Sequence, residues 1–163
     1  APENEVEQRF VEYWKRVLRR ASSVADDPIL RKVYQMFLDR QLTCPCTMSN
    51  GDFLPWNVIY DGENVVMIDW GFGGMMPYSL DIARFLAHAT ETRSTFPFYM
   101  NDAQKELFLD RMYEALKISR EQFNLDVKLA TLNEYIEFVE AEEDEDGWYL
   151  EHAQALAEEL LNL

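Results

Sequence analysis

The chain has 163 residues, of which 48% are hydrophobic, and these values are typical of a single globular domain with a buried core. Thirty acidic against 15 basic residues give a formal net charge of −15, which disfavours a nucleic-acid partner. The same charge is compatible with a cationic ligand. Alternatively, it serves only to keep the protein soluble. The sequence contains no apolar run of membrane-spanning length and no signal-peptide pattern, so we expect a cytoplasmic protein without membrane contact.

The first part of the chain predicts two helices. Apolar side chains recur at helical spacing from about residue 4 to residue 21, which indicates an amphipathic helix. Asp27 is a suitable helix cap and is followed by Pro28 at the first helical position. A second helix should therefore run from there to about Arg40.

The pattern then changes to short β-rich runs. Cys44 and Cys46 are the only cysteines, and they are too close together for an ordinary disulfide, so we expect reduced thiols just before a strand. Residues 57–69, NVIYDGENVVMID, contain two β-rich runs around an Asp-Gly pair, which predicts a hairpin. Within it, residues 65–68 should form a buried strand.

Helical spacing returns after the hairpin and continues to the end of the chain. Ser79, Asn101 and Ser119 are the expected caps of three helices, and Gln122 stands in capping-box position for the third. A last helix should span Trp148 to Leu161. The predicted fold is mostly α within the α+β class, a helical bundle with one small β-hairpin inserted after the second helix.

Three polar residues lie in or next to the hairpin. Asp52 is in the loop before the first strand, Asn57 follows five residues later, and Asp69 ends the second strand. Antiparallel pairing should bring Asn57 close to Asp69, with Asp52 nearby. Carboxylate and amide oxygens suit Mg²⁺, and a further carboxylate could orient or deprotonate a hydroxyl. Any one of these residues alone is more often an ordinary loop residue, so the hypothesis depends on their combination.

The combined pattern, NGDFLPWNVIYDGENVVMIDWGFGGMMPYSLDIARF over residues 50–85, resembles the aminoglycoside phosphotransferase family of the protein-kinase-like superfamily. That family carries His-Gly-Asp-x-x-x-x-Asn, a hairpin, Ile-Asp-Trp and then Pro-x-x-x-Asp-hydrophobic-Ala. The last part is Pro77 to Ala83 in this chain. The resemblance implies the C-terminal lobe of a kinase-like fold.

The resemblance also implies a role for each matching residue. Asp52 would be the catalytic aspartate that positions the acceptor hydroxyl, and Asn57 and Asp69 would hold Mg²⁺ against the nucleotide phosphates. Asp81 would support the catalytic loop by hydrogen bonding its backbone. The usual histidine of the family is Asn50 here, and an asparagine can also hydrogen-bond the loop backbone. The implied reaction is transfer of the γ-phosphoryl group of ATP or GTP to a hydroxyl of a small molecule.

Kinases also need a glycine-rich loop and a strand lysine, and these are missing from the sequence. No glycine precedes Gly51, and the only earlier lysines, Lys15 and Lys32, lie in predicted helices. We therefore expect residues 1–163 to form a single catalytic and substrate lobe, either part of a longer protein or an orphan lobe. Its partners would be the nucleotide, the acceptor and an N-terminal nucleotide lobe of the same protein, without which it should turn over ATP slowly or not at all.

Six of the seven residues from Glu140 to Asp146 are acidic, and such runs usually form a solvated segment. Alternatively, this run and the nearby Glu134 and Glu137 form an anionic wall for an amine-bearing acceptor, such as choline, an amino sugar or an aminoglycoside. Trp148 could stack on a sugar or cover a cation, although it could equally belong to the core.

The rival hypothesis is a catalytically silent kinase-like binding module for a cationic ligand or a protein. Asp52, Asn57 and Asp69 together favour the enzyme, because a silent module does not need all three. The missing nucleotide lobe and Asn50 favour the module.

Overall fold

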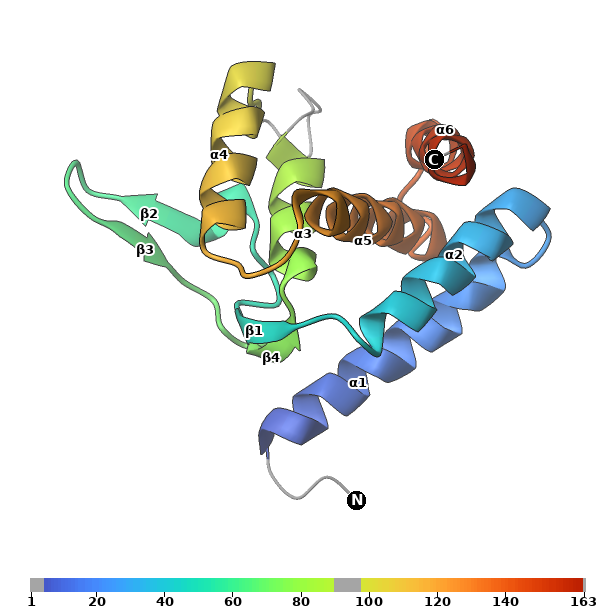
Figure 1. Cartoon of the computed structure of the whole chain (residues 1–163), viewed down its shortest axis with the longest axis horizontal. Helices are drawn as coiled ribbons and strands as arrows, with labels where there is room; N and C mark the ends of the chain where they lie inside the picture. Colours follow the sequence, from blue (N-terminus) through green and yellow to red (C-terminus); the bar gives the residue numbers. More distant parts are fainter. Residues whose placement is uncertain (1–4, 90–97, 163) are drawn as a thin grey trace.

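The computed structural model describes residues 5–89 and 98–162 (Figure 1). The helices in this part of the chain are α1 (Glu5–Arg20), α2 (Pro28–Gln41), α3 (Ser79–Ala89), α4 (Asp102–Glu114), α5 (Arg120–Glu140) and α6 (Trp148–Leu161). The strands are β1 (Cys46–Ser49), β2 (Val58–Tyr60), β3 (Val65–Met67) and β4 (Gly74–Pro77). Single 3₁₀ turns at Ala21–Val24 and Pro55–Asn57 follow α1 and precede β2.

The helices predicted from periodicity and caps are confirmed. Ser79 is not the cap predicted for α3, because it is the first residue of that helix and its buried hydroxyl has no hydrogen-bond partner among the described residues. The Asp27 side chain accepts hydrogen bonds from the first turn of α2, and Asn101 forms a complete capping box at α4. At α5 the capping box is only half formed. Ser119 accepts from the backbone N–H of Gln122, but the Gln122 side chain donates to Asp126 instead of returning to the cap.

Helix α5 lies at the centre of the molecule and packs against α2, α3 and α6 (Figure 1). The main core fills the space between α1, α2, α5 and α6. Its completely buried side chains are Val17, Val33, Phe37, Leu132, Ile136, Ala153 and Ala157. A second cluster lies beneath α4 and includes Tyr78, Ile82, Leu86 and Phe123. Burying one large apolar side chain stabilises a fold by about 1.5–3 kcal/mol. The packed helices therefore provide most of the stability, and the loop and the hairpin are attached to this helical body.

The predicted hairpin is confirmed: β2 and β3 pair antiparallel, with Val58 opposite Met67. A second two-stranded sheet was not predicted. In it β1 pairs antiparallel with β4, from Cys46 opposite Pro77 to Ser49 opposite Gly74. Both strands are only four residues long, and no turn signal joins them. Their pairing fixes the two ends of segment 50–73, which contains Asp52, Asn57 and Asp69; the last part of the motif, from Pro77 to Ala83, follows in β4 and α3.

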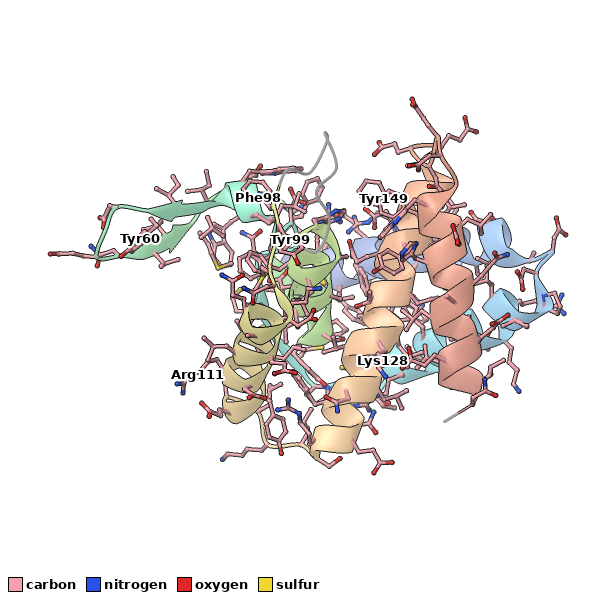
Figure 2. The ribbon with its side chains drawn as sticks, turned by 90° about the horizontal axis from the view of Figure 1, so that it is seen from above. Tyr60, Phe98, Tyr99, Arg111, Lys128 and Tyr149 are labelled. Carbon is pink, nitrogen blue, oxygen red and sulfur yellow. The ribbon has the colours of Figure 1, made fainter. Side chains whose placement is uncertain are left out.

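The prediction that residues 65–68 form a buried strand is wrong. Val65 is 67% exposed, Val66 51% and Ile68 40%. The hairpin extends away from the helices, and Tyr60 lies near its far end (Figures 1 and 2). In sheet pairing, β2 and β3 have only each other, so this apolar run stays open along much of its length.

Both cysteines are free thiols, as predicted. Cys44 is buried, and its burial raises its pKa to about 12. Cys46 is the first residue of β1. Among the helices described here, none is both long and apolar enough to cross a lipid bilayer.

Candidate active site

The loop that follows β1 is held by Asp81 in the first turn of α3. The backbone N–H of Asn50 donates to Asp81 Oδ2 at 2.6 Å, and that of Gly51 donates to Oδ1 at 3.0 Å. Burial raises the pKa of Asp81 above its ordinary value of 3.8, although these two bonds act in the opposite direction. One side chain thus joins the loop to a helix of the body.

Gly51 is required by its backbone conformation and by its surroundings. Its φ is +80°, a value that other residues rarely adopt. A Cβ at this position would lie 2.3 Å from the carbonyl oxygen of Phe72. The loop can therefore pass against the segment after β3 only with glycine here.

Asn50 is completely buried and joins the loop to the end of β3. Its Nδ2 donates to the carbonyl oxygens of Ile68 at 3.1 Å and Asp69 at 3.3 Å. Its Oδ1 accepts from the backbone N–H of Asp52 at 3.2 Å. Asn50 thus makes three bonds that fix the loop, at the position where the resembling family carries histidine.

Both oxygens of the Asp52 carboxylate have donors. Asn57 Nδ2 donates to the Asp52 carbonyl at 2.8 Å and lies 3.3 Å from its Oδ2. Arg84, from the middle of α3, donates to Oδ1 through Nε at 2.8 Å and lies 2.7 Å from it through Nη2. The structure thus brings Asp52 and Asn57 into contact and adds an arginine that the sequence analysis did not select.

Asp69 comes two residues after β3, and the residue before it, Ile68, is hydrogen-bonded to Asn57 beyond the last paired residues of the hairpin. The N–H of Ile68 donates to the Asn57 carbonyl at 2.9 Å. Asp69 has a φ of 57°, which is uncommon for a residue other than glycine. Its side chain is exposed, and within the described residues it has neither a hydrogen-bond donor nor an ion-pair partner. This carboxylate is therefore available to a ligand.

A cavity of about 260 Å³ lies beside Asp52. Its walls come from α1, the loop, the segment before α3, and helices α3 and α5. The residues with charged or polar side chains that line it are Tyr13, Arg16, Arg20, Ser49, Asp52, Asp81, Arg84, Asn133, Glu134 and Glu137. Phe72, Met76 and Leu80 contribute apolar surface.

Glu134 and Glu137 line this cavity, but arginines of the same chain pair with both. Arg84 Nη1 lies 2.8 Å from Glu134 Oε2 and 3.5 Å from Glu137 Oε1. Arg20, which is 4% exposed, contacts Glu137 at 2.6 Å. Burial alone would raise the pKa of Glu134, but the Arg84 charge and further cationic neighbours outweigh it and the pKa is lowered. Much of the expected anionic wall is therefore already neutralised.

Trp148 is not among the residues that line this cavity. It stacks on His152, with ring centroids 3.6 Å apart, in an aromatic cluster between α5 and α6. Part of the acidic run is structural as well. Asp144 accepts from two backbone N–H groups at the start of α6, and Glu140 pairs with Arg20 at 3.0 Å.

Residues 2–117 match the model of the Phosphotransferase enzyme family, APH. The chain belongs to this family. The match confirms the resemblance seen in the motif, and the mostly helical fold with its small hairpin is that of the kinase-like lobe. The matched range includes the loop, the hairpin and α3, and it ends before α5. We find no match among curated proteins or solved structures.

Arg84 and Arg20 are the main site residues that sequence reasoning missed. A signal for Arg84 was present, because it stands three residues after Asp81 and therefore faces the same side of α3. Arg20 had no comparable signal. It lies near the end of an amphipathic helix, and its partners on α5 are more than 110 residues away.

Proposed function

We propose that this chain is the catalytic lobe of a small-molecule phosphotransferase. It would transfer the γ-phosphoryl group of ATP or GTP to a hydroxyl of a small acceptor. The observation that carries the proposal is the arrangement of Asp52 in the cavity wall, in contact with Asn57 and next to the end of the hairpin where Asp69 is exposed. Membership of a phosphotransferase family supports it.

In this proposal Asp52 orients the acceptor hydroxyl and accepts its proton as transfer proceeds. The new bond joins the acceptor oxygen to the γ-phosphorus, and the bond from that phosphorus to the β,γ-bridging oxygen breaks. The nucleoside diphosphate leaves with the bonding electrons. Because such reactions depend chiefly on alignment and on opposing the moving charge, the rigid setting of Asp52 is the protein's main contribution.

Asn57 and Asp69 fit a Mg²⁺ ion, which would bind the nucleotide phosphates and stabilise their charge. Asn57 donates through Nδ2 and keeps its Oδ1 free of hydrogen-bond donors within the described residues, and the Asp69 carboxylate has no partner there. Oxygen donors of this kind are those that Mg²⁺ prefers. The described residues hold no group of three or more His, Cys, Asp or Glu side chains suited to a metal, so phosphate oxygens and water would have to supply the other ligands.

For the acceptor we propose a small hydroxyl compound, with amine-bearing alcohols as the first class to test. A cavity of about 260 Å³ suits a choline-like alcohol or a single amino sugar better than a whole multi-ring aminoglycoside. The net charge of −15 would attract cations. Of the two cavity carboxylates on α5, Glu137 is the more accessible to an acceptor, because its side chain is 35% exposed whereas that of Glu134 is 6% exposed.

We further propose that a nucleotide-binding lobe of the same protein covers the β2–β3 hairpin. The large apolar residues exposed on and around the hairpin are Trp56, Ile59, Tyr60, Val65, Val66, Ile68, Trp70 and Phe72. Large apolar side chains that stay exposed in such number on one short segment support an interaction site there. The chain alone should accordingly turn over ATP very slowly or not at all.

The second candidate is a catalytically silent binding module. It is favoured by the contact between Arg84 and Asp52, because a carboxylate held by an arginine is less open to a substrate. The two candidates differ in how activity responds to loss of the Asp52 carboxylate.

The test is an acceptor screen with γ-labelled ATP and GTP, in the natural gene product that carries this chain and in its Asp52→Asn variant. The proposal predicts Mg²⁺-dependent transfer of label to at least one hydroxyl compound. It also predicts that the variant is slower by a factor on the order of 10²–10⁴, the range expected for loss of a general base. Transfer at the same rate in both proteins would contradict the proposed role of Asp52. A wild-type protein that binds amines but transfers no label would favour the binding module.

A further inference from the structure

The two oxygens of the Asp52 carboxylate are used unequally. Oδ1 receives two nitrogens of the Arg84 guanidinium, at 2.8 and 2.7 Å. Oδ2 receives only the Asn57 amide, at 3.3 Å. Because each carboxylate oxygen offers about two lone-pair sites, Oδ1 is saturated whereas Oδ2 can accept one more hydrogen bond.

Arg84 is itself fixed on its other side. Its Nη1 contacts Glu134 at 2.8 Å, and Glu134 lies on the central helix with a side chain that is only 6% exposed. The Arg84 side chain is 17% exposed. A planar guanidinium held by two carboxylates has little freedom to rotate, so it transmits the position of α5 to the catalytic loop.

We propose that Arg84 is a positioning residue that holds the Asp52 carboxylate in one orientation, with Oδ2 directed to the acceptor hydroxyl. The inference rests on the proposed function and adds a determinant outside the motif that identifies the family. Arg84 also supplies a fixed positive charge beside Asp52. An acceptor therefore does not have to bring a cation to this carboxylate, and neutral alcohols become possible substrates alongside amines.

The experiment compares kcat and KM for both substrates in the natural gene product and in five variants, three that test the contact and two that test rescue by guanidinium. Arg84→Met removes the guanidinium and leaves the buried Glu134 without its closest partner, with His88 Nε2 next at 3.8 Å, so the variant can fail to fold. The double variant Arg84→Met with Glu134→Gln removes both charges and avoids that cost. The matched control is Arg40→Met, because Arg40 forms an equally close fork to Asp126, at 2.7 and 2.8 Å, away from the cavity.

We expect the double variant to lose kcat by about 10²-fold, the cost of misplacing a catalytic group, while KM for the nucleotide changes little. Millimolar guanidinium should restore part of the rate to an Arg84→Ala variant and none to Asp52→Asn. Arg40→Met should lower thermal stability without a selective loss of kcat.

Wild-type kcat in the double variant would overturn the inference, as would a rate loss that matches the Arg40 control without guanidinium rescue. In either case the slower transfer by Asp52→Asn would leave the proposed function standing. Absence of transfer in the wild-type protein would overturn the proposed function and this inference together.

Discussion

The two halves of the candidate site are supported very differently. The loop half, from Asn50 to Asp52, is tied to α3 by Asp81 and to the central helix through Arg84. The hairpin half ends in an exposed Asp69 and carries Val65 and other apolar residues open to solvent. The helical body therefore supplies two anchors for the Asp52 loop, whereas the metal and nucleotide side that we propose lies on a hairpin that is largely exposed in this chain.

The largest expected effect concerns the buried charges that support the loop half. Arg20→Met removes the buried guanidinium shared by Glu137, Glu140 and Asn133 and should lower the free energy of unfolding by about 3 kcal/mol, although each of the three keeps one other partner. Urea unfolding followed by circular dichroism measures the difference. Arg19→Met is the matched control, because Arg19 shares Glu140 but its side chain is 67% exposed. Equal losses in the two variants would show that the buried network does not support this half.

The next prediction is a change that should affect the loop but not the hairpin. Asp81→Ala removes the acceptor of two backbone N–H groups and should cost about 2 kcal/mol of stability. The amide hydrogens of Asn50 and Gly51 should then exchange much faster with solvent, measured by NMR, while those of β2 and β3 keep their rates. Unchanged exchange at Asn50 and Gly51 would contradict the role given to Asp81.

A pH titration of stability should show the same buried network. The pKa of Glu134 and that of Glu140 are lowered from the ordinary value of 4.5, so the unfolded chain binds protons first as the pH falls. Stability should be constant above about pH 5 and fall below pH 4.5, by about 1 kcal/mol for each proton and pH unit. Asp81, whose pKa is raised above 3.8, acts in the opposite direction. Urea midpoints between pH 7 and pH 3.5 measure the slope, and Glu134→Gln should reduce it; a flat profile would contradict these shifts.

The smallest effect is expected on the hairpin. Val66→Thr should change stability by less than about 0.5 kcal/mol, because surface substitutions generally do. Val33→Thr is the control, since Val33 is completely buried in the main core and should lose several times as much. Thermal unfolding of the two variants measures the contrast. A large loss for Val66→Thr would mean that the hairpin packs on the body in solution.

The sequence was sufficient for the features that depend on local pattern. Helix periodicity, the Asp27 cap and the Asp-Gly hairpin each act over a few residues, and each was predicted correctly. The β1–β4 pairing was missed because its stability comes from residues about 30 positions apart. The exposure of Val65 was missed because an apolar run favours burial, but the run itself does not show whether this chain or another part of a protein would bury it.

The site followed the same division. The spacing of Asp52, Asn57 and Asp69 was visible in the sequence, and the structure hydrogen-bonds Asn57 to Ile68, the residue just before Asp69. The pairing of Glu134 with an arginine of the same chain could not be predicted from the sequence. Helical periodicity places Glu134 on α5, but it cannot show that Glu134 forms an ion pair with Arg84, which is 50 residues away in the sequence.

The most direct test of the site is to measure Mg²⁺-ATP binding and phosphoryl transfer side by side in Asp52→Asn and Asp69→Asn variants of the natural gene product. If Asp52 positions the acceptor, its variant should bind Mg²⁺-ATP as tightly as the wild-type protein and transfer phosphate on the order of 10²–10⁴ times more slowly. If Asp69 holds the metal, its variant should lose Mg²⁺-dependent nucleotide binding. Normal transfer by either variant would contradict the assignment of that residue, and normal transfer by both would contradict the proposed active site.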